Sequence, residues 1–291
     1  MMEELVHKAE VLMEALPYIQ KFSGKIAVVK FGGSAMEKPD VTQSTMRDIV
    51  LLQAIGMKVV VVHGGGKAIT ARLKELDIPT KFINGLRVTC ERTIKVVDEI
   101  LHDVVNRALI QDISICGGTG VQISGKKILR CEKSYSKDLT TGESLDIGFV
   151  GKVISVDPTP ILDALDFGVI PVLTPLATDF HGQPYNINAD IAACEVAKAL
   201  HSEKLVFLSD VPGVLRDPSN ENDIISIIHV NDISKLIADG ILSGGMIPKI
   251  QSSANAIENG VTQVHMIDGR KPHSLLLEIF TDKGVGTQIV A

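Results

Sequence analysis

Apolar and polar residues follow one another along this chain in blocks typical of alternating strands and helices. Continuous apolar runs at residues 25–31 ("KIAVVKF") and 58–62 ("KVVVV") are typical of parallel strands covered on both faces. The segment 41–57 between them has helical periodicity that ends near Gly56. Further strands are predicted over residues 121–131, 153–156, 168–174, 204–209 and 262–267, and a helix over 190–201. This order predicts an α/β fold with an open, mostly parallel sheet sandwiched by helices.

An amphipathic helix is predicted ahead of the first strand. Its apolar stripe consists of Leu5, Val6, Ala9, Leu12, Met13 and Leu16. Pro17 is expected to stop this helix. Such a stripe packs either on its own domain or on a neighbouring subunit, and periodicity does not choose between the two.

The chain is predicted to divide into three parts. A second series of strands and helices begins near residue 200, and we place a lobe boundary there. The parts are an N-terminal helix (1–23), an N-terminal lobe (24–200) and a C-terminal lobe (201–291).

Composition narrows the classes of ligand and partner. With 291 residues, of which 45% are hydrophobic, the chain can bury a sizeable core. A net charge of −6 without any basic cluster argues against nucleic acid as a partner. No apolar run approaches the roughly 18 residues of a membrane span, and the first residues lack a signal-peptide pattern. We therefore expect no membrane association and a cytoplasmic location.

The cysteines do not indicate a cross-linked or metal-binding protein. Cys90, Cys116, Cys131 and Cys194 are widely spaced and form no CxxC pair. We expect reduced thiols, and we expect no dedicated metal site.

Two glycine clusters follow the first two strands. Lys30 precedes Gly32 and Gly33, and His63 precedes the glycines at 64–66. Because the carboxyl ends of parallel strands meet at one edge of a sheet, both clusters should share one rim. Neither cluster fits GxxxxGK[ST] or GxGxxG, and each alone is equally typical of a tight turn. Two clusters beside a lysine favour an anion site built from backbone N–H groups.

Two charged residues stand at predicted helix starts. Lys249 follows Pro248 in the first turn of a helix, where a cation opposes the helix dipole by about 0.3–1 kcal/mol unless an anion lies between them. This lysine is either solvated or part of an anion site. Asp190 follows Asn186 and Asn188 at the start of another helix. It either caps that helix or holds two lysines in position.

The chain contains six short segments in this order: "KFGGSAM", "VVVVHGGGKAI", "NGLRVT", "YNINAD", "LSDVPGVL" and "GGMIPK". In order and spacing they resemble the motifs of the amino acid kinase family, in the branch that phosphorylates N-acetyl-L-glutamate. The resemblance covers essentially the whole chain and is highly specific. It implies transfer of the γ-phosphoryl group of ATP to the side-chain carboxylate of N-acetyl-L-glutamate, a step of arginine biosynthesis.

The resemblance also implies roles for individual residues. Lys30 and Lys249 would stabilise the transferring phosphoryl group, and Asp190 would organise both. The residues expected to donate backbone N–H groups are Gly32, Gly33, Gly64 and Gly65. Those expected around the acceptor substrate are Gly65, Gly66, Arg87 and Asn186. Those expected to bind the nucleotide in the C-terminal lobe are Ser209, Asp210, Leu215 and Ser243.

The implied chemistry explains why a lysine ends an apolar strand. A carboxylate that attacks a phosphoryl group brings two anions together, so catalysis consists mainly of positioning and of charge stabilisation. The attacking carboxylate, with an ordinary pKa of about 4.3, is already ionised at neutral pH. No general base is required, and His63 is predicted to be structural. Magnesium is expected on the ATP phosphates, which supply much of its coordination.

Arg87 carries the expectation about the acceptor. Its planar guanidinium can grip a carboxylate with two hydrogen bonds. Without the family motif, a surface arginine in a loop would be the better interpretation.

Two alternatives remain open. A related kinase could act on another side-chain carboxylate, such as acetylaminoadipate, because the phosphate-handling residues are shared. A non-catalytic arginine or nucleotide sensor could keep the same fold. The joint presence of Lys30, Asp190 and Lys249 argues against the sensor, which has no use for transition-state donors.

The two ends of the chain resemble the arginine-sensitive group of the family. The N-terminal helix is followed by "ALPYIQKF", and the C-terminal segment reads "HSLLLEIFTDKGVGTQIV". The resemblance implies a homohexamer joined by N-terminal helices, and feedback inhibition by arginine. Glu278 is the expected partner of the cationic effector, with Gly284 and Gly286 in a nearby turn. Glu278 is equally typical of a carboxylate on a helix surface.

Overall fold

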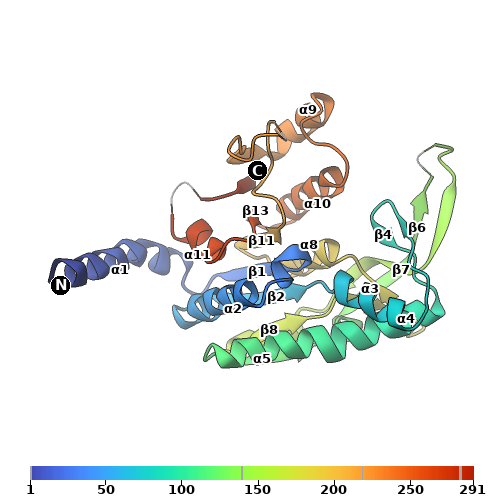
Figure 1. The fold of residues 1–291 in the computed structure, drawn as a ribbon, viewed down its shortest axis with the longest axis horizontal. Helices are drawn as coiled ribbons and strands as arrows, with labels where there is room; N and C mark the ends of the chain where they lie inside the picture. Colours follow the sequence, from blue (N-terminus) through green and yellow to red (C-terminus); the bar gives the residue numbers. More distant parts are fainter. Residues whose placement is uncertain (1, 139, 218, 282–283) are drawn as a thin grey trace.

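An eight-stranded sheet forms the centre of the molecule (Figure 1). The computed structural model describes residues 2–138, 140–217, 219–281 and 284–291. The strand order is β12-β14-β13-β11-β1-β2-β8-β5, and every pairing is parallel except that of β13 with β14. The strands are β1 (Ile26–Phe31), β2 (Lys58–His63), β5 (Gly120–Ile123), β8 (Ile170–Leu173), β11 (Lys204–Ser209), β12 (Ile227–His229), β13 (Gln263–Asp268) and β14 (Thr287–Val290). The prediction of a mostly parallel sheet is confirmed.

Helices cover both faces of this sheet, as predicted. One face carries α6 (Gly125–Ile128), α7 (Thr159–Asp166), α8 (Ala189–Ala199), η3 (Val230–Asp232), α9 (Ile233–Ala238) and α10 (Met246–Glu258). The other carries η1 (Gly33–Met36), α2 (Pro39–Ala54), α3 (Gly66–Glu75), α4 (Glu91–Glu99), the π-helical η2 (Ile100–Asn106), α5 (Arg107–Ile115) and α11 (Ser274–Ile279).

The inner strands are buried on both faces because their side chains alternate between two cores. Val28 of β1 joins the core under α8 and α10, whereas Val29 joins the core under α2 and α5. In β2, Val62 and Val61 divide in the same way. This two-sided burial explains the continuous apolar runs in the sequence.

A small closed barrel stands beside the sheet. Its strands are β6 (Leu129–Lys137), β7 (Ser144–Val156), β9 (Leu176–Thr178) and β10 (Pro184–Asn186). The hairpin of β3 (Phe82–Ile83) and β4 (Leu86–Arg87) contacts it through β4 and β7.

The prediction of a single strand over residues 121–131 is wrong. The segment is split, because β5 ends at Ile123, α6 forms a short turn, and β6 starts at Leu129. Gly125 lies against the backbone of Thr174 and Leu176, and its N–H donates to Thr174 Oγ1 at 3.0 Å. The chain turns at this close approach and leaves the central sheet for the barrel.

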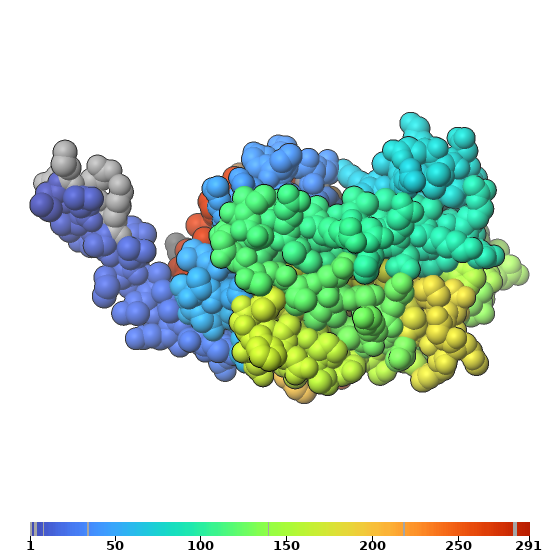
Figure 2. Space-filling model, turned by 90° about the horizontal axis from the view of Figure 1, so that it is seen from below, coloured from blue at the N-terminus to red at the C-terminus, as the bar shows by residue number. Residues whose placement is uncertain are grey.

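Helix α1 (Met2–Phe22) extends away from the body of the molecule (Figures 1 and 2). The prediction that Pro17 ends this helix is wrong, since the helix continues for another turn. Both Pro17 and Met13 are exposed, so solvent can meet the Met13 carbonyl that Pro17 leaves without a helical N–H partner. Leu12 and Met13 of the apolar stripe are 73% and 64% exposed, so this chain alone does not cover the stripe. Met1 of the predicted helical part lies outside the described residues.

The predicted lobe boundary near residue 200 falls in the connection between α8 and β11. The sheet is continuous across this boundary, because β1 pairs with β11. The division into lobes therefore stays a prediction about function rather than about separate sheets. Within the described ranges, no helix is both long and apolar enough to cross a membrane.

The close approach at Gly125 yields a prediction about stability. A Cβ atom in Gly125→Ala would overlap the carbonyl oxygens of Thr174 and Leu176, and backbone cannot move away as a flexible side chain can. We expect this change to lower the free energy of unfolding by about 1–3 kcal/mol. Gly245→Ala is the control, because a Cβ there meets open space at a negative φ. Thermal melting of both variants measures the difference, and equal melting temperatures would contradict the prediction.

Candidate active site

Three charged side chains from distant parts of the chain meet at the carboxyl edge of the sheet. Lys30 Nζ lies 2.9 Å from Asp190 Oδ1, and Lys249 Nζ lies 3.3 Å from Asp190 Oδ2. Their side chains are 13%, 19% and 22% exposed for Lys30, Lys249 and Asp190. The cluster is therefore shielded by protein yet still open to a ligand. The predicted role of Asp190 as the residue between two lysines agrees with this geometry.

Local structure explains the position of each of these side chains. Lys30 follows Val28 in the alternation of β1, so its side chain points to the face covered by α8 and α10. Asn188 caps α8, and its Oδ1 accepts a hydrogen bond of 2.8 Å from the Asp190 N–H. Lys249 lies in the first turn of α10, as predicted. Asp190 is the anion that makes a cation tolerable at this helix start.

The carboxyl group of Asp190 is held in its charged form. Burial alone would raise its pKa, but the charges and hydrogen bonds of Lys30 and Lys249 outweigh burial and hold the pKa below its ordinary value. Lys249 Nζ also lies 5.6 Å from the ring centre of Phe207, in the strand next to β1. Two lysines around one carboxylate leave the cluster with a surplus of positive charge.

The two glycine clusters share one rim, as predicted from the parallel strands. The Gly64 N–H donates to the Phe31 carbonyl at 2.7 Å. A Cβ on Gly32 would lie 3.1 Å from Gly64 N and 3.4 Å from Lys30 Nζ, so the two loops touch through their backbones beside the lysine. Gly33 has φ +67°, which favours glycine.

The second cluster leads directly into a helix. Gly65 is the N-cap of α3, and Gly66 is its first residue. Backbone N–H groups at such a helix start are suited to an anion.

Arg87 is buried at the base of the second glycine loop. Its Nη2 donates to the Gly66 carbonyl at 2.9 Å and to Thr70 Oγ1 at 2.8 Å. Its Nη1 is buried and makes no hydrogen bond within the described residues. Burial lowers the pKa of Arg87 from its ordinary value. A guanidinium with one nitrogen fixed by protein and one unpaired can receive a carboxylate.

Asn186 is linked to Arg87 through Thr89. The Asn186 Nδ2 lies 3.4 Å from Thr89 Oγ1, and this hydroxyl donates to the Arg87 carbonyl at 2.8 Å. The two predicted substrate residues therefore belong to one connected group. Thr89 and Thr70 were not predicted as site residues. Thr89 ends the "NGLRVT" segment, and that position was the available signal.

The residues predicted for the nucleotide are more dispersed. Ser209 ends β11, next to β1, and its hydroxyl lies 3.4 Å from Asp210 Oδ1. Leu215 forms an isolated bridge with Ile224, and Ser243 precedes the first residue of α10 by three positions. Ser209 and Asp210 are therefore in contact with each other, and the other two lie in separate loops of the C-terminal region.

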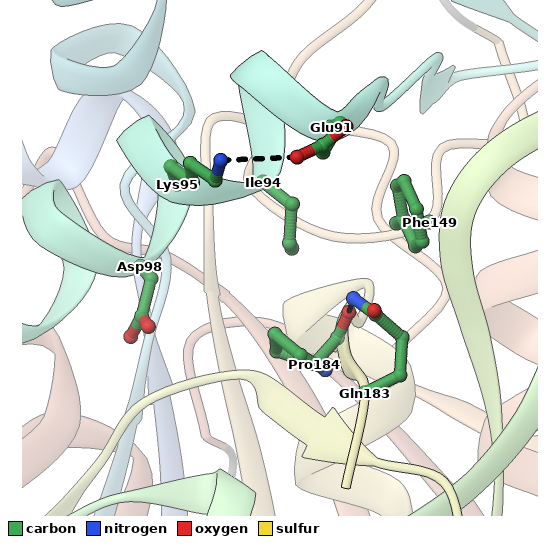
Figure 3. Close-up of a pocket in the computed structure, with 7 residues that line it drawn as sticks. All are labelled: Glu91, Ile94, Lys95, Asp98, Phe149, Gln183 and Pro184. Carbon is green, nitrogen blue, oxygen red and sulfur yellow. Dashed lines mark hydrogen bonds and ion pairs between the residues drawn. The ribbon is translucent and has the colours of Figure 1, made fainter. Parts of the chain in front are cut away.

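Among the described residues, the Lys30–Asp190–Lys249 cluster is part of neither a metal-binding group nor the pocket of Figure 3. The described parts of the chain contain no group of three or more His, Cys, Asp or Glu side chains that could hold a metal ion. The pocket of Figure 3, with a volume of about 410 Å³, lies between α4 and the start of β10. Ile94, Phe149 and Pro184 form its apolar wall, and the Glu91–Lys95 ion pair of 3.0 Å lies at its rim. None of the predicted catalytic residues lines it.

A second pocket, of about 420 Å³, surrounds the predicted regulatory residues. It lies where the end of α1 meets α11 and the amino ends of β11 and β13, and it is lined by Tyr18, Lys21 and Phe22 of α1, together with Glu278, Gly284 and Gly286. Glu278 is only 6% exposed, so its interpretation as a surface carboxylate is wrong. Its Oε2 accepts from the Val285 N–H at 2.7 Å, which draws the glycine turn around it.

Glu278 ends a buried polar chain. Its Oε1 lies 2.6 Å from His265 Nδ1, and His265 Nε2 lies 3.0 Å from Lys204 Nζ. Burial alone would raise the pKa of Glu278, but His265, Lys204 and the Val285 N–H together outweigh burial and hold this pKa below its ordinary value. The carboxyl group therefore stays charged. Burial lowers the pKa of Lys204 to about 8.

The sequence and the fold of this chain have known counterparts. The model of the amino acid kinase family matches residues 25–268. An acetylglutamate kinase of Caldanaerobacter subterraneus subsp. tengcongensis is 47% identical, over 97% of this chain and 93% of the relative. An acetylglutamate kinase of Heliobacterium modesticaldum is 44% identical, over 99% of this chain and 100% of the relative. The chain therefore belongs to the amino acid kinase family, in the branch of the acetylglutamate kinases.

A solved structure is similar as well. An N-acetylglutamate synthase from Neisseria gonorrhoeae, complexed with coenzyme A and N-acetyl-glutamate, superposes with a TM-score of 0.83 at 26% identity. The match covers 96% of this chain and 62% of the synthase, so the synthase is the longer protein.

Proposed function

We propose that this chain transfers the γ-phosphoryl group of ATP to the side-chain carboxylate of N-acetyl-L-glutamate, giving N-acetyl-L-glutamyl 5-phosphate and ADP. This reaction is a step of arginine biosynthesis. The observation that carries the proposal is the Lys30–Asp190–Lys249 cluster beside two touching glycine loops, in a chain 44% and 47% identical to acetylglutamate kinases. Because the reaction consumes ATP, we place the enzyme in the cytoplasm.

The charges of the cluster suit this reaction. Attack of one anion on another accumulates negative charge on the transferring group, and the lysines can stabilise it on two sides. Asp190 is already engaged with both lysines, so it serves as their organiser rather than as a base. The acceptor carboxylate is ionised near neutral pH and needs no proton removed.

The glycine loops supply uncharged donors for the same anions. Gly32, Gly33 and Gly65 offer backbone N–H groups close to Lys30, where a side chain at Gly32 would obstruct the approach. The predicted donor role of Gly64 needs correction, because its N–H already donates to the Phe31 carbonyl and so supports the loop instead. ATP enters with its magnesium ion, which its own phosphates largely coordinate. Ser209, Asp210, Leu215 and Ser243 hold the nucleotide on the side of the C-terminal lobe.

Arg87 and Asn186 orient the acceptor. The unpaired Nη1 of Arg87 receives the α-carboxylate of N-acetyl-L-glutamate, beside Gly65 and Gly66 at the start of α3. Asn186, which Thr89 connects to Arg87, contributes a further polar contact to the acceptor. This arrangement fixes the part of the substrate that does not react, so the side-chain carboxylate faces the lysines.

One assay tests the reaction and the acceptor together. ATP is supplied with N-acetyl-L-glutamate, L-glutamate or N-acetyl-L-2-aminoadipate, and hydroxylamine traps any acyl phosphate as a hydroxamate. We expect the fastest ADP release and hydroxamate formation with N-acetyl-L-glutamate. A preference for the longer analogue would replace the substrate, and the absence of product with all three acceptors would refute the kinase proposal.

The two lysines yield the first prediction about activity. Lys30→Ala and Lys249→Ala should each lower kcat by roughly a hundredfold to a thousandfold, on the scale of a lost transition-state donor. KM values for both substrates should change less. Lys58→Ala is the control, because Lys58 pairs with Asp166 at the far end of the neighbouring strand. Near-normal kcat at saturating substrates in either lysine variant would contradict the assigned role.

Arg87 yields a prediction that separates acceptor from donor. Arg87→Lys should raise KM for N-acetyl-L-glutamate by roughly tenfold to a hundredfold, because a lysine cannot reproduce a fixed, planar pair of donors. KM for ATP should stay nearly constant. Arg72→Lys on the exposed side of α3 is the matched control. An equal rise in both KM values would place the role of Arg87 elsewhere.

We further propose that arginine inhibits this enzyme from the pocket around Glu278, in a homohexamer joined by α1. Glu278 is a buried, charged carboxylate that can accept further hydrogen bonds from a guanidinium, and Gly284 brings the backbone close to it. Gly286, in the same turn, lies against the backbone of Met266 and lines the pocket. The exposed stripe of α1 supports contact with another subunit. Tyr18 and Phe22 tie that helix to the pocket, so one element serves both assembly and regulation.

Removal of residues 1–20 tests this regulatory proposal. The truncated protein should be a dimer with weakened arginine inhibition and intact catalysis, because it loses the intersubunit helix and Tyr18 of the pocket. Light scattering gives the assembly, and the arginine concentration for half-inhibition gives the coupling. Glu278→Gln in the full chain should weaken inhibition while leaving the hexamer. A truncated protein that stayed hexameric and fully sensitive would refute the role of α1.

A further inference from the structure

The long helical run over residues 91–115 contains a π-helical segment, η2, beside the glycine loop. A π-turn inserts an extra residue into the helix and is frequent at functional sites. Here it packs Leu101 and Val105 on Gly65, where a Cβ would lie 2.6 Å from Leu101 Cδ2 and 3.5 Å from Val105 Cγ2. The last residue of this segment, Asn106, is fully buried at 0% exposure.

Asn106 faces the buried ring of His63 at the end of β2. His63 follows Val59 and Val61 in the strand alternation, so its ring points to the α5 face, away from Lys30. Asn106 Nδ2 lies 3.1 Å from His63 Nε2 and donates to the Val172 carbonyl at 2.9 Å. Since a backbone carbonyl can only accept, the Val172 contact fixes which end of the amide faces His63.

This orientation determines the tautomer of His63. The NH2 group of Asn106 can only donate, so His63 Nε2 must be the unprotonated acceptor. The proton of the neutral ring then sits on Nδ1, which donates to the Gly64 carbonyl at 2.8 Å. Burial lowers the pKa of His63 to about 4, with the Gly64 carbonyl acting in the opposite direction, so the ring is neutral at neutral pH.

The Gly64 carbonyl belongs to the peptide plane that also carries the Gly65 N–H. Because the peptide is planar, fixing the oxygen fixes the direction of that N–H. The other side of Gly64 is fixed as well, since its own N–H donates to the Phe31 carbonyl. The loop is therefore held between β1 and the His63–Asn106 pair.

The pair has a cost that packing alone does not explain. Asn106 Oδ1 is buried and finds no hydrogen-bond partner within the described ranges. A buried polar atom without a partner destabilises the folded state, and its presence calls for a compensating role.

We propose that Asn106 is a positioning residue for phosphoryl transfer, acting through His63 to hold the Gly64–Gly65 peptide of the phosphate-binding loop. Asn106 selects the Nδ1–H tautomer, and that proton anchors the Gly64 carbonyl. The inference rests on the proposed kinase function of the loop. It assigns neither residue to contact with substrate.

The tautomer can be measured in the unaltered protein. Imidazole ¹⁵N spectra should show a histidine in the neutral Nδ1–H form from pH 6 to 9 whose signal His63→Asn removes. His265, whose Nδ1 faces Glu278 and whose Nε2 faces Lys204, should give a second Nδ1–H signal that remains in this variant. An Nε2–H form for His63 would overturn the proposal. This measurement is independent of whether the protein phosphorylates N-acetyl-L-glutamate.

Asn106→Asp tests the coupling to catalysis with almost no change of shape. A carboxylate facing Nε2 favours a proton there, so at high pH the ring switches to Nε2–H and releases Gly64. At low pH the imidazolium keeps Nδ1–H as well. We expect kcat at pH 8 to fall roughly tenfold to a hundredfold, below the loss of a whole donor, with a partial recovery toward pH 6 that the parent lacks. KM values should change less than kcat.

Two further variants separate positioning from stability. His63→Asn keeps an N–H donor near the Gly64 carbonyl and should retain more activity than His63→Leu. Leu109→Ala, at a buried position in α5, should lower the melting temperature without changing the shape of the kcat–pH profile. If Asn106→Asp showed the parental kcat and pH profile while the parent phosphorylated N-acetyl-L-glutamate, the proposal would fail and the kinase function would stand. If the parent showed no kinase activity but kept the Nδ1–H tautomer, the proposed function would fail instead.

Discussion

The attraction of one carboxylate for two lysines is the interaction on which the site depends. Asp190 joins β1, α8 and α10, which come from three distant parts of the chain. Without the carboxylate, two cations at low exposure would repel each other, and removing one member of a partly buried charge group leaves its partners uncompensated. Asn188 supports this arrangement by capping α8 directly beneath Asp190. The cap thus connects the stability of a helix to the geometry of the charges.

The two-sided sheet lets neighbouring positions of one rim do different work. Side chains alternate between faces, so Lys30 points toward α8 and α10 while His63 points toward η2. The glycine loops therefore have the charged side chain of Lys30 on one face of the sheet. On the other face, His63 forms a hydrogen bond to the Gly64 carbonyl. In the proposed reaction the charged side faces the transferring group, and the neutral side is buried. A single strand edge can therefore carry both the electrostatics of the reaction and the support that keeps the loops in place.

The sequence predicts those features whose cause is local. Lys30 and the glycines can be recognised in the sequence because a lysine and then glycines come at the end of an apolar strand. Lys249 can be recognised because a cation near a helix N-terminus opposes the helix dipole. Of the two interpretations of Glu278, that of a surface carboxylate is wrong, because its burial comes from a pocket shared by α1, α11 and β13, which no local pattern contains. From the sequence, no helix is predicted over 91–115, where the structure has one. The π-turn in this helix depends on packing against Gly65, which is distant in the sequence. Asn106 could not be found from sequence for the same reason, since its partners His63 and Val172 are remote in the chain.

The positions of the pocket around Glu278 and of the proposed nucleotide site constrain how the proposed regulation could reach catalysis. Lys204 begins β11 in the pocket around Glu278, and Ser209 ends the same strand beside the proposed nucleotide site. A strand of this length spans about 17 Å at roughly 3.3 Å per residue, so an effector cannot touch the reacting groups. The proposed inhibition by arginine would therefore require two arrangements of the chain or of its subunits, one of which binds arginine more tightly. Every residue of β11 is buried and closely packed, so a change at one end of this strand would reach the other end by a shift of the whole strand. Helix α1 lines the pocket at one end and extends away from the body of the molecule at the other, so in this proposal it is the element that links effector binding to the arrangement of the subunits.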